Sequence, residues 1–158
     1  MSFTSNVKNE IISISRLKLE EISFLSAIIR NNVIEDKIKI STENASVAKY
    51  IYKLIKKLYD IPIKVAVRKG YNFKKSYIYM IEISNKKNII LEDLGIIENG
   101  KELLIPPNFI IDDDELIKSY LCGLFLSIGS INDPKTSRYH LEFVTSNLEY
   151  ANFISKLL

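Results

Sequence analysis

Two stretches of this chain repeat one apolar pattern at a constant spacing, and this repeat limits the folds available to the sequence. Residues 37–55 find their partners within residues 139–158 at an offset of 103, and upstream residues 25–34 find theirs within residues 121–131 at an offset of 96. The aligned pairs of the first match are Ile40 with Phe143, Thr42 with Thr145, Ala48 with Ala151, Ile51 with Ile154 and Leu54 with Leu157. Such a period is typical of a duplicated unit. The sequence favours two copies of a helix, hairpin and helix, with two unrelated α+β segments as the alternative.

The apolar spacing of the first copy predicts a complete set of elements. They are helices at 7–14 and 22–29, a strand at 37–42, a helix at 47–58 capped by Thr42, strands at 61–67 and 76–84 that form a hairpin, and a helix at 86–94. Gly95 follows the last helix and suits the left-handed conformation that closes many helices. We therefore assign residues 1–95 to the first unit.

The second copy starts after a segment that interrupts regular structure. Residues 96–111 contain Asn99-Gly100 and Pro106-Pro107, and we interpret them as a connector. The second unit, 112–158, is expected to hold a helix capped by Asp112 to Asp114, a turn at 132–134, a strand at 140–145, and a last helix with a capping box of Ser146 and Glu149. It lacks an equivalent of residues 61–94. We expect the natural protein to continue, because half a sheet would leave an unpaired edge.

Composition leaves the function open but excludes some environments. A net charge of +3 is too small for a general electrostatic attraction to nucleic acid, so DNA binding would need a local concentration of charge. Cys122 is the only cysteine, which excludes an internal disulfide and fits a reducing compartment. No signal peptide or membrane-length apolar run is found in the sequence. We expect a cytoplasmic protein, associated with the nucleoid, that makes no membrane contact.

The run YLCGLFLSIGSIND (120–133) resembles the LAGLIDADG motif of homing endonucleases, with Leu121, Gly123, Leu124 and Gly129 on motif positions. The whole chain resembles the N-terminal part of the WhiA family of bacterial sporulation and cell-division transcription regulators. The segments that carry this second resemblance are SFTSNVKNEI (2–11), STENASVAKYIYKLIKKLY (41–59), ILEDLGI (90–96) and GSINDPKTSRYHLEFVTSN (129–147).

The resemblance implies an α+β fold of two LAGLIDADG-like αββαββα-type units related by pseudo-twofold symmetry, the second of them incomplete here. The two motif helices are expected to pack together, and close approach needs small side chains. Ser26 and Ala27 in the first helix correspond to Cys122 and Gly123 in the second. A small buried apolar role for Cys122 competes with a reactive thiol.

DNA cleavage by this fold needs a carboxylate at the end of each motif helix, because Mg²⁺ prefers oxygen ligands. The two positions are Asn32 and Ile128, and neither offers a charged ligand. Glu35, Asp36 and Asp133 lie nearby and are the alternative source of carboxylates. We therefore predict no catalytic residues, no enzyme activity, and no metal or other cofactor. Asp112 to Asp114 are interpreted as helix caps, and His140 has no metal-binding companion.

A retained DNA surface would lie on the predicted hairpin, since endonucleases of this fold read the major groove with their sheets. The candidate DNA-binding residues are Lys64, Arg68, Lys69, Lys74 and Lys75, with Tyr71 and Phe73 beside them. The alternative is that these lysines only keep an exposed hairpin soluble. The resemblance places sequence-specific binding on a C-terminal helix-turn-helix domain that this chain does not contain.

Three functional classes compete. The favoured one is a non-catalytic N-terminal region of a WhiA-like DNA-binding transcription regulator acting in cell division, chromosome segregation or sporulation. Its partners would be DNA, chiefly through the absent helix-turn-helix domain, and a regulatory protein. The alternatives are a protein-interaction scaffold without DNA affinity and an active homing endonuclease.

Overall fold

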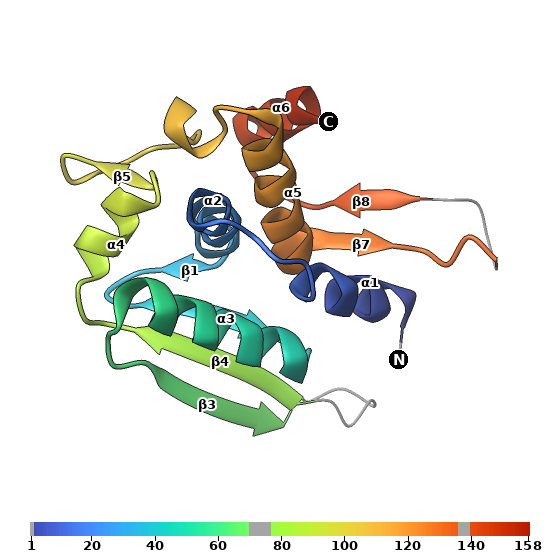
Figure 1. Ribbon diagram of the computed structural model, residues 1–158, viewed down its shortest axis with the longest axis horizontal. Helices are drawn as coiled ribbons and strands as arrows, with labels where there is room; N and C mark the ends of the chain where they lie inside the picture. Colours follow the sequence, from blue (N-terminus) through green and yellow to red (C-terminus); the bar gives the residue numbers. More distant parts are fainter. Residues whose placement is uncertain (1, 70–76, 136–139) are drawn as a thin grey trace.

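Each copy of the repeat folds as a helix, an antiparallel strand pair and a second helix. The computed structural model describes residues 2–69, 77–135 and 140–158. In the first unit the repeated elements are α2 (Lys18–Arg30), β1 (Val33–Ile34), β2 (Ile38–Thr42) and α3 (Ala45–Tyr59). In the second unit they are α5 (Asp114–Ile128), β7 (Gly129–Ile131), β8 (Leu141–Phe143) and α6 (Leu148–Leu157). The same order in both places confirms the predicted pair of α+β units (Figure 1).

The first unit is extended by the predicted hairpin, which consists of β3 (Lys64–Lys69) and β4 (Tyr77–Ile83). The four strands form one antiparallel sheet in the order β1-β2-β4-β3. β3 begins later than predicted, because Ile61 is buried in the core and Ile63 packs beside it rather than pairing with β4. As the edge strand, β3 leaves all six of its residues exposed. Among the described residues the second unit has no counterpart of β3 and β4.

The sheet has one covered face and one open face. Ile38 and Ile40 of β2, with Ile81 and Ile83 of β4, are buried and form one core cluster with the apolar side of α3, which lies along this face (Figure 1). Because side chains alternate along a strand, their neighbours point to the other face. That open face comprises, from the strand register, Val33, Lys39, Ser41, Ile78, Met80, Glu82, Lys64, Ala66 and Arg68.

The helix starts differ from the predicted caps but repeat between the units. Asn44 caps α3 by accepting from the Val47 amide, and Asn147 caps α6 by accepting from the Tyr150 amide. The backbone amide of each asparagine donates to the hydroxyl of the threonine two residues earlier, Thr42 at 3.2 Å and Thr145 at 3.4 Å. The prediction of Thr42 and of a Ser146–Glu149 box as caps was therefore wrong. Asparagine is the cap in both places because its side-chain oxygen reaches the backbone amide three residues later.

Asp113 caps α5 by accepting from the Leu116 amide at 2.9 Å, so the capping prediction for the acidic run is confirmed. The helix predicted at 86–94 is α4 (Lys87–Asp93), and Gly95 after it has a φ of 67°. A Cβ at Gly95 would also lie 2.7 Å from Pro107 Cδ, so glycine is needed there for conformation and for space.

The segment predicted as a plain connector has short elements of its own. β5 (Ile97–Glu98) and β6 (Lys101–Glu102) form a small hairpin, and the 3₁₀-helix η1 (Asn108–Ile110) follows. Arg30 of α2 fastens this segment, because its guanidinium donates to the carbonyl oxygens of Leu103 and Gly95. These two hydrogen bonds hold the segment against α2, and Ile110 of η1 is buried in the core cluster that also includes Tyr120 of α5.

The motif helices α2 and α5 lie against each other at the centre of the molecule (Figure 1), and both core clusters draw on them. The larger cluster, built mainly from the first unit, includes Leu126 of α5. The smaller one, built mainly from the second unit, includes Ala27 of α2. α1 (Phe3–Ile12) has no buried residue and lies beside α5, β7 and the start of α3.

Candidate functional site

The C-terminal ends of α2 and α5, here called the feet of the motif helices, carry the two positions at which cleavage residues were sought. Asn32 follows the end of α2, and its side chain makes three polar contacts. Its Nδ2 donates to the Ile28 carbonyl oxygen at 2.7 Å and lies 3.4 Å from Ser127 Oγ, and its Oδ1 accepts from the Ser41 amide at 3.1 Å. A carboxylate has no N–H to give to Ile28. The native contacts of Asn32 therefore require an amide at this position.

Ile128 ends α5, and its partly buried side chain packs against the smaller core cluster. The residue that reaches the first foot is its neighbour Ser127, whose Oγ lies 3.4 Å from both the Ile28 carbonyl oxygen and Asn32 Nδ2. The sequence comparison paired Asn32 with Ile128 and did not single out Ser127. An alignment fixes equivalent positions, whereas the crossing of the two helices decides which side chains meet.

Of the four residues predicted to pack between the motif helices, two lie at the contact between α2 and α5 and two have other neighbours. A Cβ at Gly123 would lie 2.2 Å from the Phe24 carbonyl oxygen and 3.1 Å from Ala27 Cβ, so Gly123 and Ala27 lie where α2 and α5 approach most closely. Ser26 is fully buried, but its Oγ donates to the Leu94 carbonyl oxygen at 2.6 Å, toward α4. Cys122 is half-buried against the larger cluster, and its sulfur is a free thiol.

A buried polar chain joins the first foot to the second unit. Asn31 Nδ2 donates to the Tyr150 hydroxyl at 3.0 Å, and the hydroxyls of Tyr150 and Tyr120 lie 2.6 Å apart. Burial is the main cause that raises the pKa of both phenols above the ordinary value of 10.0. The pair therefore stays neutral and serves to hold α5 and α6 against α2.

The predicted basic cluster is only partly on one surface. Lys64 and Arg68 lie on the open face of the sheet, as predicted from the alternation. Lys69 belongs to the opposite face with Val65 and Val67, so the register does not bring it to Lys64 and Arg68. Lys74 and Lys75 lie outside the described residues. The neighbouring charges on the open face are Lys39 and Glu82, and Glu82 also lies 3.9 Å from Lys37 Nζ.

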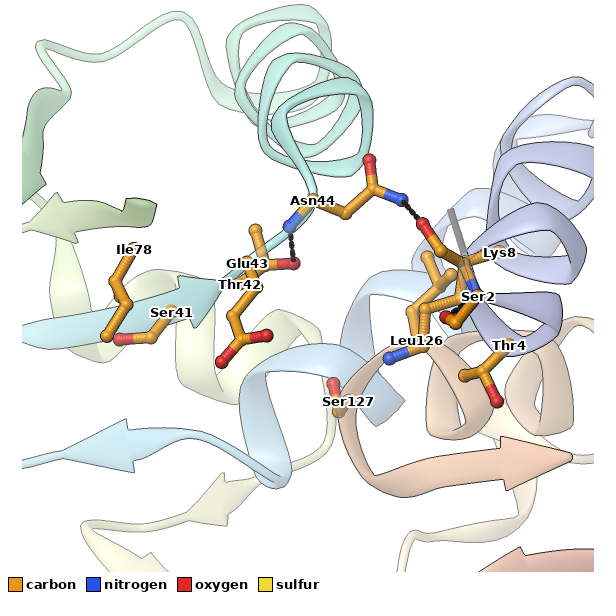
Figure 2. Close-up of a pocket in the computed structure, with 11 residues that line it drawn as sticks. Ser2, Thr4, Lys8, Ser41, Thr42, Glu43, Asn44, Ile78, Leu126 and Ser127 are labelled. Atoms are coloured by element: carbon orange, nitrogen blue, oxygen red, sulfur yellow. Dashed lines mark hydrogen bonds between the residues drawn. The ribbon is translucent and has the colours of Figure 1, made fainter. Parts of the chain in front are cut away.

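A cavity of about 670 Å³ opens beside the feet, between α1, the turn from β2 to α3, and the last turn of α5 (Figure 2). Sequence reasoning did not locate this cavity, because its walls come from segments more than a hundred residues apart. Its lining is rich in hydroxyls and also includes Lys8 and Glu43. The lining residues are Ser2, Thr4, Ser5, Lys8, Ser41, Thr42, Glu43, Asn44, Ile78, Leu126 and Ser127.

Across residues 2–69, 77–135 and 140–158, no three acidic, histidine or cysteine side chains gather into a group that would hold a metal ion. His140 is exposed, and its Nε2 lies 3.2 Å from Glu142 Oε2. No helix in the described part of the chain is long and apolar enough to cross a membrane.

Comparison with known proteins agrees with this architecture. Residues 20–97 match the model of the WhiA N-terminal LAGLIDADG-like domain, and residues 117–158 match that of the WhiA LAGLIDADG-like domain. The chain is 38% identical over its full length to probable cell division protein WhiA of Staphylococcus aureus, strains USA300 and Newman. It spans about half the length of these curated relatives, 52% of each.

Solved structures give the same result. The N-terminal LAGLIDADG domain of DUF199/WhiA matches with a TM-score of 0.71 and 26% identity, covering 99% of this chain and 72% of that one. Full-length DUF199/WhiA from Thermatoga maritima also matches at 0.71, with 25% identity over 99% of this chain and 49% of that one. A variant of I-DmoI in complex with its target DNA shares the fold at a TM-score of 0.52 and 14% identity, covering 88% of this chain and 76% of that one. This chain therefore belongs to the WhiA family and carries its LAGLIDADG-like region.

Proposed function

We propose that this chain is the non-catalytic N-terminal region of a WhiA-like transcription regulator that acts in cell division, chromosome segregation or sporulation. The proposal depends on the residues at the two feet, where neither side chain is a carboxylate. Asn32 is engaged through an amide N–H that a carboxylate lacks, and Ile128 contributes an aliphatic side chain to the core. Relatives named as cell division proteins and the DNA-bound relative of the same fold support a regulatory role on DNA.

The absence of paired carboxylates at the feet argues against hydrolysis of DNA. Metal-assisted cleavage needs ions held by oxygen ligands so that they position water and stabilise the leaving oxygen. Asn32 offers a neutral oxygen that already accepts from Ser41, and Ile128 offers none. Glu35 and Asp36 belong to the turn between β1 and β2, where they are exposed to solvent. The region is therefore a binding module in this proposal.

Plasmid nicking tests the catalytic half of the proposal. The purified chain is incubated with supercoiled plasmid and Mg²⁺ or Mn²⁺, and the expected result is no nicking above a metal-free control. Asp133→Ala serves as the matched variant, because Asp133 is the nearest acid after the second foot. Metal-dependent nicking that this substitution abolishes would overturn the assignment as non-catalytic.

The open face of the sheet is the surface on which this region would contact DNA in support of the helix-turn-helix domain. Lys64 and Arg68 are exposed there and lie on one strand, with Lys39 two strands away. Glu82 lies among them and reduces the net charge. We therefore expect weak, salt-sensitive contacts to phosphates rather than base recognition.

Salt-dependent binding separates this role from a pure protein scaffold. Replacing both Lys64 and Arg68 with alanine should reduce the slope of log affinity against log salt by about two, since each lost phosphate contact removes roughly 0.9. The control is the double variant Lys49→Ala, Lys53→Ala, which removes the same charge from the exposed side of α3. Equal binding by both variants and the parent at low salt would favour the scaffold.

A further inference from the structure

The cavity beside the feet is built mainly by three segments that the fold brings together, with Ile78 of β4 completing the lining. α1 contributes its first two turns, the turn from β2 to α3 contributes Thr42 to Asn44, and α5 contributes Leu126 and Ser127. α1 is fixed in place from both sides. Thr4 Oγ1 donates to the carbonyl oxygen of Ile131 in β7 and accepts from the amide of the same residue, while Asn44 Nδ2 donates to Ser5 Oγ at 3.1 Å. The cavity is therefore a defined hollow between the two units.

Several of its polar groups already have partners. Ser2 Oγ accepts from the Ser5 amide, Thr42 Oγ1 accepts from the Asn44 amide, and both ends of the Asn44 side chain are engaged. Among the described residues, the side chains of Lys8, Glu43 and Ser41 lack such partners. Within the part of the chain that the structure describes, their side chains take part in no hydrogen bond or close ion pair. In the described part of the lining, the cavity thus offers an ammonium, a carboxylate and a hydroxyl that make no hydrogen bond or close ion pair.

The two charges occupy different walls. Figure 2 shows Lys8 on the α1 side and Glu43 on the β2–α3 side, with Ser127 on the helix foot between them. Burial lowers the pKa of Lys8, and the charge of Glu43 opposes that change without a direct ion pair. A partly desolvated ammonium with unused donors is stabilised by a bound anion. Both α1 and α3 also begin at the cavity, so the positive ends of their dipoles add to the preference for negative charge.

The remaining lining limits the kind of anion. Hydroxyl groups dominate, and carboxylates accept well from the neighbouring hydroxyls of a sugar. Among the described residues none that lines the cavity is aromatic, so this part of the lining gives a nucleobase no ring to stack on. The volume of about 670 Å³ is within the usual range for small-ligand sites. Recognition would therefore fall on a sugar and its phosphate.

We propose that this cavity binds a phosphorylated sugar, with the phosphate at Lys8 and the sugar hydroxyls at Glu43 and Ser41. The same chemistry is present in a free sugar phosphate and in the sugar phosphate of a nucleotide. The site lies beside the feet of the motif helices and would make the region a sensor of a small metabolite. It does not depend on the proposed contact with DNA.

Titration calorimetry on the full chain tests the proposal with ribose 5-phosphate as the probe, and with ribose, inorganic phosphate and adenosine monophosphate for comparison. The expected order is saturable binding of ribose 5-phosphate, weaker binding of inorganic phosphate and none of ribose. Adenosine monophosphate should bind within about threefold of ribose 5-phosphate, because the base adds no stacking. Tighter binding of adenosine monophosphate by tenfold or more would contradict the assignment to the sugar phosphate.

Substitutions at Lys8 and Glu43 test which part of the ligand each charge binds. Lys8→Gln should weaken the binding of ribose 5-phosphate by about tenfold or more, as expected for loss of a charge-assisted hydrogen bond. Glu43→Gln should reduce the preference for ribose 5-phosphate over inorganic phosphate. Lys49→Gln removes an equal charge from the exposed side of α3 outside the cavity and should change nothing. Circular dichroism verifies that each variant is folded.

Three further results would overturn the proposal. They are no saturable binding of ribose 5-phosphate by the folded chain, binding that Lys8→Gln leaves unchanged, and equal affinity for inorganic phosphate. If a short DNA duplex binds in a Lys8-dependent manner while ribose 5-phosphate does not, the phosphate site belongs to the DNA backbone instead. Because these measurements use small probes, their failure leaves the plasmid and salt-slope experiments unaffected.

Discussion

At the scale of single residues, the contact between the motif helices depends on Gly123. A Cβ there would lie 2.2 Å from the Phe24 carbonyl oxygen, which is backbone within α2 and cannot rotate away. Helix preference alone would favour alanine over glycine by about 1 kcal/mol. Glycine is present because close packing of α2 and α5 outweighs that preference.

Gly123→Ala should therefore lower the free energy of unfolding by about 1–3 kcal/mol, the usual cost of overpacking. Gly123→Leu should cost more, since the larger side chain enters the same contact. Urea denaturation followed by circular dichroism measures both changes.

Gly100 is the control for this size series, because a Cβ there meets nothing within 4 Å and only its φ of 78° disfavours a side chain. Gly100→Ala and Gly100→Leu should cost similar amounts. A Gly123→Ala variant as stable as the parent would contradict the close approach of the helices.

At the scale of elements, the two asparagine caps have the same local role but different surroundings. Asn44 and Asn147 are 103 residues apart, the offset of the repeat, and each caps the helix that follows its hairpin. Asn44 has an additional role, because its Nδ2 donates to Ser5 Oγ and to Asn9 Oδ1 at 3.0 Å. α1, which buries no residue of its own, is held on α3 by this amide.

Asn147→Ala should cost about 1 kcal/mol for loss of a cap, and Asn44→Ala about 2–3 kcal/mol, because it loses the cap and two further hydrogen bonds. Asn44→Asp separates the two roles, since it keeps the capping oxygen and removes the donor. Amide hydrogen exchange should show α3 still protected and α1 less protected in that variant. Unchanged protection of α1 would show that the asparagine amide does not hold it.

At the scale of the whole molecule, the two units share their core. Leu126 of α5 belongs to the cluster of the first unit, Ala27 of α2 belongs to that of the second, and Asn31 joins the first foot to Tyr150. The boundary predicted between residues 95 and 112 is therefore a boundary of sequence units, and we propose that it does not separate independently folding domains.

Leu124→Ala tests this cooperativity, because Leu124 is fully buried in the smaller cluster. It should destabilise the chain by about 2–5 kcal/mol, the usual cost of truncating a buried leucine. Amide signals from α3 and from α6 should disappear at one common urea concentration, lower than in the parent. Retention of the α3 signals after loss of the α6 signals would mean that the units unfold separately.

The sequence alone determined the features that depend on local pattern. The repeat at an offset of 103, the alternation that places Lys64 and Arg68 on one face, and Gly95 at the end of a helix follow from spacing and backbone chemistry that neighbouring residues control. The strand starting at Lys64 rather than Ile61 and the caps at Asn44 and Asn147 were missed, because burial and side-chain reach decide among adjacent candidates.

Only the tertiary structure decided what lies at the feet of the motif helices. The crossing of α2 and α5 brings Ser127 to Asn32 and turns Ile128 into the core, although the alignment equates Asn32 with Ile128. The fold of both units places Lys8, Glu43 and Ser127 around one cavity. These side chains are far apart along the chain, and the periodic pattern that specifies each element contains no information about which elements meet.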